Sequence, residues 1–167
     1  MQDTEAVRKI IDQHNANLVK WYASGDIDKV AEVFAEDCWQ MPPHAEPMVG
    51  REALRAGWKQ ATQWGKWDFT LQAQDVAVNG HIAVERGKYT LKFSAGPEAP
   101  PGLVSYEDKG NYVVFWRMES DKQWRIVWDA PVSDATPGIK LGSSRITSRL
   151  SRRRGMQSDG AAAQRGC

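Results

Sequence analysis

Apolar residues in the first part of the chain recur at intervals of three and four positions, which is the spacing of one helix face. The pattern runs from Val7 to Tyr22 and predicts a helix there. Gly25 is expected to end this helix in a left-handed conformation, and Asp26 can cap a short second helix over 27–35. The first quarter of the chain therefore favours two consecutive helices.

The pattern then breaks at two prolines. Pro42 and Pro43 exclude helix, and the residues before them, 38–41, predict a short extended segment. A third helical pattern follows Gly50, and beyond Gly65 the apolar residues alternate with polar ones instead.

Alternation with a period of two predicts two β-hairpins in the second half of the chain. Segments 66–78 and 81–93 flank an Asn-Gly turn, and segments 111–119 and 124–132 flank a Ser-Asp-Lys turn. Helices that precede such a meander indicate an α+β fold. We expect three N-terminal helices packed on a strongly curved antiparallel sheet, with a hollow between the two layers.

The composition is that of a globular domain with an unusual number of large aromatic rings. The chain has 167 residues, of which 41% are hydrophobic and 26% charged, and eight are tryptophan. No apolar run approaches the roughly 20 residues that span a bilayer, so no membrane partner is expected. The acidic, amphipathic start is not a secretory signal. Cys38 and Cys167 form no disulfide framework, which favours a cytoplasmic setting.

The net charge of +1 conceals an asymmetry that divides the chain. Residues 1–136 carry 15 Lys and Arg against 20 Asp and Glu, whereas 137–167 carry seven against one and no aromatic ring. We therefore predict a domain over 1–136 and a basic, disordered tail over 137–167. The tail could touch nucleic acid or an acidic surface, but without interleaved aromatic residues a solvated extension is favoured and no nucleic-acid partner is expected.

Several local strings resemble the NTF2-like superfamily, in its SnoaL-like, ketosteroid-isomerase-like and DUF4440 branches. The strings are Ala23-Ser24-Gly25-Asp26, Val33-Phe34-Ala35-Glu36-Asp37-Cys38, Met41-Pro42-Pro43, Val49-Gly50-Arg51-Glu52-Ala53-Leu54, 109–116 and 124–129. The resemblance covers about 4–134. It implies an NTF2-like cone and a homodimer formed through the open sheet face. It does not fix an activity, because this fold serves isomerases, cyclases, dehydratases, hydrolases and binding modules.

The steroid-isomerase chemistry of the family can be compared residue by residue. The position of its helical tyrosine falls on Leu18, that of its carboxylate base at or beside Pro42, and that of its oxyanion acid near Val114. All three are apolar here. The resemblance therefore implies a similar pocket with different chemistry.

Glu85 is the first candidate for that chemistry. Alternation places it on the same side of its strand as Gly87, Tyr89 and Phe93, where burial would raise its pKa and make it a usable acid or base. The competing interpretation is a carboxylate near a strand end, or one paired with an inward cation such as Arg117.

Asp129 and His14 are the other two candidate catalytic residues. The position of Asp129 in the last strand faces the cavity in many relatives, and its carboxylate could hold a water or pair with His14. His14 lies between Ile11 and Leu18 on the inward stripe and could carry a proton near neutral pH. The alternatives are an acid bonded to backbone or arginine, and a hydrogen-bonded core histidine.

Six further residues would line a cavity under this fold and touch an apolar ligand: Trp39, Met41, Trp58, Tyr89, Trp116 and Trp128. Some of them must be ordinary core. The chain shows no zinc spacing, phosphate loop, dinucleotide fingerprint or nucleophile elbow, so we expect neither metal nor cofactor.

Together these observations predict a cofactor-free enzyme of the SnoaL-like type. It would act on a small apolar or polyketide-like molecule by acid–base proton transfer, as an isomerase, cyclase, dehydratase or hydrolase. The alternative is a non-catalytic module for small-ligand binding or dimerisation that uses the same cavity. Convergence of Glu85, Asp129 and His14 would favour catalysis.

Overall fold

A computed structural model describes residues 3–43 and 45–135 of the chain. Its helices are α1 (Thr4–Ser24), α2 (Ile27–Glu32) and α3 (Arg51–Trp64). Its strands are β1 (Phe34–Gln40), β2 (Met48–Val49), β3 (Gly65–Asn79), β4 (Ile82–Ala95), β5 (Tyr106–Met118) and β6 (Trp124–Ser133). The predicted boundary at 136/137 and the predicted basic tail lie outside the described residues.

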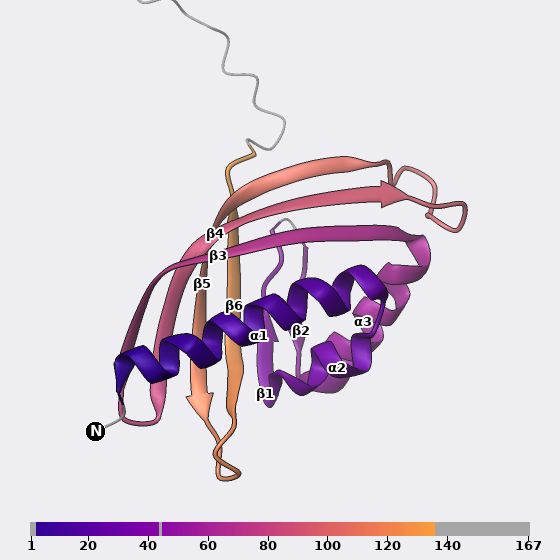
Figure 1. Ribbon diagram of the computed structural model, residues 1–167. Coiled ribbons are helices and arrows are strands. Elements are labelled where there is room, and N and C mark those ends of the chain that lie inside the picture. Colours follow the sequence, from indigo (N-terminus) through magenta and orange to yellow (C-terminus); the bar gives the residue numbers. More distant parts are fainter. Residues whose placement is uncertain (1–2, 44, 136–167) are drawn as a thin grey trace, which may run out of the picture. The chain divides into compact units, whose positions relative to one another are not determined.

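The three helices cover one face of a six-stranded curved sheet, so the predicted α+β cone is confirmed (Figure 1). The strands follow the order β2-β1-β6-β5-β4-β3. Strands β3 to β6 form the predicted antiparallel meander. The sheet is mixed, however, because β1 pairs in parallel with β6. The sequence pattern of β1 does not indicate which strand it pairs with, so its parallel pairing with β6 could not be predicted.

The second helix is shorter than the sequence pattern predicts. It ends at Glu32, and the chain enters β1 at Phe34, which pairs with Ile126 of β6 and is 1% exposed. Residues 33–35 are apolar because they are buried at the end of α2 and the start of β1. An apolar run this short does not distinguish a helix from a strand.

Helix α1 begins and ends as local chemistry requires. The Asp3 side chain accepts a hydrogen bond from the backbone N–H of Glu5, and Gly25 closes the helix at a φ of 72°. The buried stripe of this helix consists of Val7, Ile11, Asn15, Leu18 and Tyr22. This stripe places two side chains with polar groups, Asn15 and Tyr22, against the concave face of the sheet.

The register of the sheet places four side chains of interest in one row across its concave face. Glu85 of β4 pairs with Val114 of β5, Val114 pairs with Asp129 of β6, and Asp129 pairs with Gln40 of β1. Neighbouring strands are about 4.8 Å apart, so Glu85 and Asp129 lie about 10 Å apart at the backbone, with Val114 between them.

No described helix is long and apolar enough to cross a membrane.

Gly87 allows the Tyr112 ring to pack against β4. A Cβ atom added at Gly87 would lie 2.3 Å from the Tyr112 hydroxyl and 2.5 Å from the Gln72 carbonyl oxygen. We expect Gly87→Ala to lower the free energy of unfolding by about 2 kcal/mol, measured by urea denaturation. Gly96→Ala is the control, because its added Cβ would meet nothing closer than 3.4 Å. Equal effects of the two substitutions would contradict this packing.

Candidate functional site

A cavity of about 650 Å³ lies between the concave face of the sheet and the helices. This volume is within the range of small-molecule sites. Aromatic rings from three different elements pack against one another in its wall: Tyr22 contacts Trp58 and Phe69 at ring-centroid distances of 4.5 and 5.0 Å, and Trp58 contacts Trp67 at 5.3 Å. The wall is therefore largely apolar.

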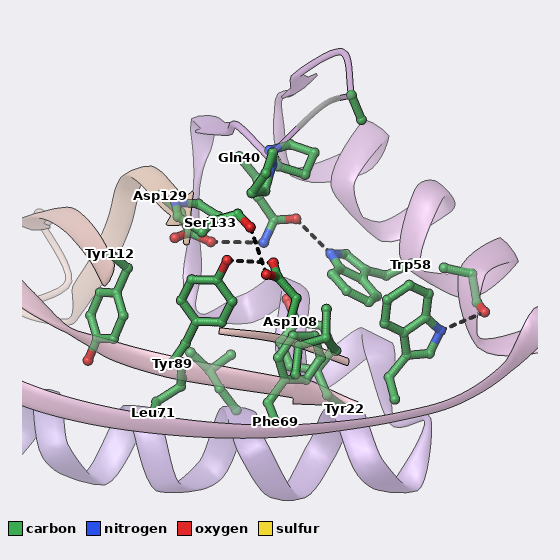
Figure 2. A pocket seen from close by; sticks show the side chains of 18 of the residues that line it. Tyr22, Gln40, Trp58, Phe69, Leu71, Tyr89, Asp108, Tyr112, Asp129 and Ser133 are labelled. Carbon is green, nitrogen blue, oxygen red and sulfur yellow. Dashed lines mark hydrogen bonds between the residues drawn. The ribbon is translucent and has the colours of Figure 1, made fainter. Parts of the chain in front are cut away.

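A chain of hydrogen bonds crosses one side of this cavity. The Trp58 indole N–H donates to Gln40 Oε1 at 2.6 Å, and Gln40 Nε2 donates to Asp129 Oδ2 at 2.9 Å. Figure 2 shows Gln40 between the other two side chains. Because both ends of the Gln40 amide are engaged, its orientation is fixed, and it holds the Asp129 carboxylate in one position.

Asp129 is the titratable group of this site. Burial raises its pKa to about 6, although the hydrogen bond from Gln40 opposes the shift, and the charge of Glu85 adds to it. Asp129 Oδ1 has no hydrogen-bond partner among the described residues. A carboxylate with one unsatisfied oxygen and such a pKa is suited to accept a proton from a bound molecule near neutral pH.

Tyr22 contributes a second unsatisfied polar group. Its side chain is 7% exposed, and its hydroxyl makes no hydrogen bond of good geometry in the described part of the chain, although the Gln40 side chain lies near enough to oppose the rise in its pKa. Burial and the charge of Asp129 raise the pKa of Tyr22, so the hydroxyl keeps its proton. A buried hydroxyl without a partner is unfavourable unless a bound molecule or water satisfies it.

Glu85 is fully buried, as its alternation predicts, but it is sealed from the cavity. Its Oε1 accepts hydrogen bonds from Asn15 Nδ2 at 2.6 Å and from the Tyr112 hydroxyl at 2.7 Å. Its Oε2 accepts one from the Trp116 indole N–H at 2.9 Å. Burial raises the pKa of Glu85, and the three donors oppose the shift. Asn15 and Tyr112 line the cavity in its place.

His14 does not join either carboxylate. Its ring stacks on Trp116 with centroids 5.5 Å apart, and burial, with the charge of Arg125, lowers its pKa. The buried stripe of α1 passes through Asn15, one residue further along the helix. The predicted convergence of Glu85, Asp129 and His14 is therefore not observed.

A second polar cluster lies elsewhere on the same wall. The hydroxyls of Tyr89 and Ser133 donate to opposite oxygens of the Asp108 carboxylate, at 2.8 and 2.6 Å (Figure 2). Ser133 lies four residues from Asp129 on β6, a distance of about 13 Å along an extended strand. Burial, followed by the bond to Asp108, raises the pKa of Tyr89, which stays a neutral donor.

Of the six predicted ligand contacts, Trp58 and Tyr89 line the cavity. Trp116 is core and bonds Glu85, and Met41 lies outside the lining, with its backbone N–H bonded to the Asp129 carbonyl. Trp39 and Trp128 are 43% and 51% exposed on the outer face. Adjacent residues of a strand point to opposite faces. Trp39 and Trp128 therefore face outward where their neighbours Gln40 and Asp129 face inward.

Sequence reasoning missed Gln40, Tyr22 and Asn15. Gln40 has the same parity as buried Cys38, and a polar side chain at an inward position is the one signal that could have indicated it. Asn15 and Tyr22 lie on the same buried stripe as Ile11 and Leu18, so a sequence pattern predicts them to be core residues. Only the tertiary packing shows that they meet a cavity.

No group of three or more His, Cys, Asp or Glu side chains within 3–43 and 45–135 is arranged to hold a metal ion.

Comparison with known proteins identifies the domain to which these residues belong. A family model described as a SnoaL-like domain matches residues 16–126, which include α1 from Ala16 onward and three residues of the row, Gln40, Glu85 and Val114; Asp129 lies three residues beyond the match. No curated protein matches the chain.

Solved structures show the same fold at low sequence identity. An NTF2-like superfamily protein from Salmonella enterica subsp. enterica serovar Typhimurium str. LT2 is 16% identical with a TM-score of 0.69, covering 84% of this chain and 99% of that one. A ketosteroid isomerase-like protein from Erwinia carotovora atroseptica SCRI1043 is 13% identical with a TM-score of 0.65, covering 77% and 96%. An NTF2-like protein with a cystatin-like fold from Novosphingobium aromaticivorans is 20% identical with a TM-score of 0.62, covering 78% and 84%.

The pKa of Asp129 makes folding stability depend on pH. Because the folded chain keeps this proton up to about pH 6 while the unfolded chain loses it near 3.8, the stability contribution is complete at low pH and is lost as pH rises through 6. Asp129→Asn carries no such charge. We expect it to be as stable as the parent at pH 3.5 and more stable at pH 8, by roughly 1–3 kcal/mol in urea denaturation. A difference that does not change with pH would contradict the burial of this charge.

Proposed function

This chain belongs to the SnoaL-like domain family, and within it we propose a cofactor-free enzyme that moves a proton on a small apolar molecule, with Asp129 as the base. The observation that carries the proposal is the state of Asp129 in the wall of an apolar cavity. Its Oδ1 has no hydrogen-bond partner among the described residues, Gln40 holds its Oδ2, and its pKa is raised to about 6. The fold alone does not select among isomerase, cyclase, dehydratase and hydrolase chemistry.

In this mechanism the Asp129 carboxylate removes a proton from the bound molecule and returns it at another atom, so the enzyme is unchanged at the end of the cycle. The Tyr22 hydroxyl donates to the oxygen on which negative charge develops, because it is buried, keeps its proton and makes no hydrogen bond of good geometry with the described residues. Gln40 is a positioning residue, since it contacts Asp129 and Trp58.

Glu85 has a supporting part in this proposal. It is bonded to Asn15 and Tyr112, whose side chains line the cavity, and its charge raises the pKa of Asp129. His14, stacked on Trp116, has no contact with the cavity in the described structure, so we assign it no proton-transfer step.

The alternative is a module that binds a small ligand without turnover. The separation of Glu85, Asp129 and His14 favours it, because only one of the three predicted catalytic groups reaches the cavity. The two functions share the cavity and differ in what Asp129 does, so substitution of Asp129 distinguishes them.

Asp129→Asn should abolish turnover of any substrate found for the protein, by at least about a hundredfold in kcat, while ligand affinity changes little. In the parent, kcat/KM should rise with pH through about 6 and then level off, because the base acts when ionised. The checks are steady-state kinetics over pH 4.5–8.5 and isothermal titration with the same molecule. Undiminished turnover in Asp129→Asn would exclude this residue as the base.

We further propose that a second copy of the chain covers the outer face of the sheet. Register places Val84, Phe115, Trp128, Trp39 and Val49 in one row across five strands. Four of these side chains are 42–51% exposed, and the rings of Phe115 and Trp128 stack at 4.8 Å. An exposed apolar row of this kind typically marks a protein interface.

Trp128→Glu should convert a homodimer to a monomer, because it places a charge in the centre of this row. Gln60→Glu, which adds the same single charge at an exposed position of α3 on the other side of the sheet, should leave the mass unchanged. Light scattering after size exclusion measures both. A monomeric parent would contradict the homodimer, and a dimeric Trp128→Glu would exclude this face as the interface. The cytoplasmic setting stays a prediction of the sequence.

A further inference from the structure

The charged residues that line the cavity all have the same sign. Among the described lining residues the carboxylates are Glu46, Glu107, Asp108 and Asp129, and none is Lys, Arg or His. The nearby arginines are engaged elsewhere: Arg51 donates to the Phe34 carbonyl, Arg117 pairs with Asp37 and Glu119, and Arg125 pairs with Asp121. Lys92 pairs with Glu107 at 3.6 Å from outside the lining, so no cation belongs to the described wall itself.

Several uncharged donors of the wall are already engaged by the protein. The indole N–H groups of Trp58 and Trp67 donate to Gln40 Oε1 and to the Ala61 carbonyl, and the Tyr89 hydroxyl donates to Asp108. Asp129 Oδ1 remains as an acceptor for a guest. The donors that remain are uncharged and include the Tyr22 hydroxyl, the second N–H of Gln40, and the side chains of Trp64 and Tyr106, which make no hydrogen bond with the described residues.

We propose that the cavity selects apolar molecules that offer a hydrogen-bond donor to Asp129 and carry no negative charge, and that it rejects carboxylates, phosphates and sulfates. Hydroxylated and amino-substituted aromatic compounds share this chemistry. The inference rests on the proposed function only in that the cavity binds a small molecule; it does not require turnover.

The physical reason is the medium around Asp129. An anion that enters an apolar cavity loses its hydration and meets a like charge across a short, poorly screened distance. A hydroxyl or ammonium group instead donates to Asp129 Oδ1, and an ammonium group is also attracted to the faces of the surrounding indole rings.

The test is calorimetric titration of the full-length protein at pH 8 with three matched probes: 2-naphthol, 2-naphthylmethylammonium and 2-naphthoate. The naphthol and the ammonium compound should each bind at least about tenfold more tightly than the carboxylate. In Asp129→Asn the carboxylate should gain affinity and the difference should shrink to a fewfold. Glu36→Gln, which removes an exposed carboxylate of β1 outside the cavity wall, should behave like the parent.

Repeating the titration at pH 5 links the selectivity to Asp129, whose pKa is about 6. The titratable groups that act on Asp129 from the packed elements are Tyr22 of α1, Cys38 of β1, Glu85 of β4 and Tyr112 of β5. Both tyrosines and the cysteine have raised pKa values and stay neutral at pH 5 and 8. The selectivity of the parent should therefore fall at pH 5, and that of Asp129→Asn should not change.

Equal or tighter binding of 2-naphthoate by the parent at pH 8 would overturn the inference and leave the proposed proton transfer untouched. A preference that survives in Asp129→Asn would also overturn it. Failure of all three probes to bind would contradict both the inference and the small-molecule site of the proposed function. Loss of turnover in Asp129→Asn, measured separately, bears on the proposed function alone.

Discussion

The hydrogen bonds to Glu85 join helix α1 to the sheet, and the cavity depends on this junction. A fully buried carboxylate is tolerated only when its oxygens are satisfied. Here one donor comes from α1 and two come from β5, so the carboxylate fixes the helix against two strands at once. With α1 held at Asn15, its next inward turns place Leu18 and Tyr22 over the open part of the concave face.

The two inward carboxylates of the same row differ in how well the protein satisfies them. Glu85 accepts three hydrogen bonds, whereas Asp129, which lines the cavity, accepts one on Oδ2 and none on Oδ1 from the described residues. A satisfied buried acid is structural, and an unsatisfied one beside a cavity is available for chemistry. Val114 between them keeps the two sites apart, while the charge of Glu85 still raises the pKa of Asp129.

The sequence pattern predicts the fold well because the alternation of β4 and β5 and the stripe of α1 are long and regular. It fails at β1, where residues 33–35 are apolar in a strand and the parallel pairing with β6 has no local signal. Glu85 could be placed inward by parity, whereas Asp129 could not, because a register shift in β6 between Ile126 and Trp128 breaks the alternation that starts at buried Trp124. Trp39 could have been excluded by parity with buried Cys38, but Trp128 has the parity of buried Trp124 and Ile126 and faces outward only because of this shift. Gln40, Tyr22 and Asn15 could not be recognised, because their roles follow from contacts between elements far apart in the chain.

The central claim is that Asp129 is a desolvated carboxylate facing a cavity, and the most direct test is its titration. In the full-length protein, carbon-13 NMR of the side-chain carboxyl, assigned by its absence in Asp129→Asn, follows this group alone. The account predicts a midpoint near pH 6, well above the ordinary 3.8. A midpoint at the ordinary value would mean that Asp129 is hydrated like a surface acid, and it would contradict the account.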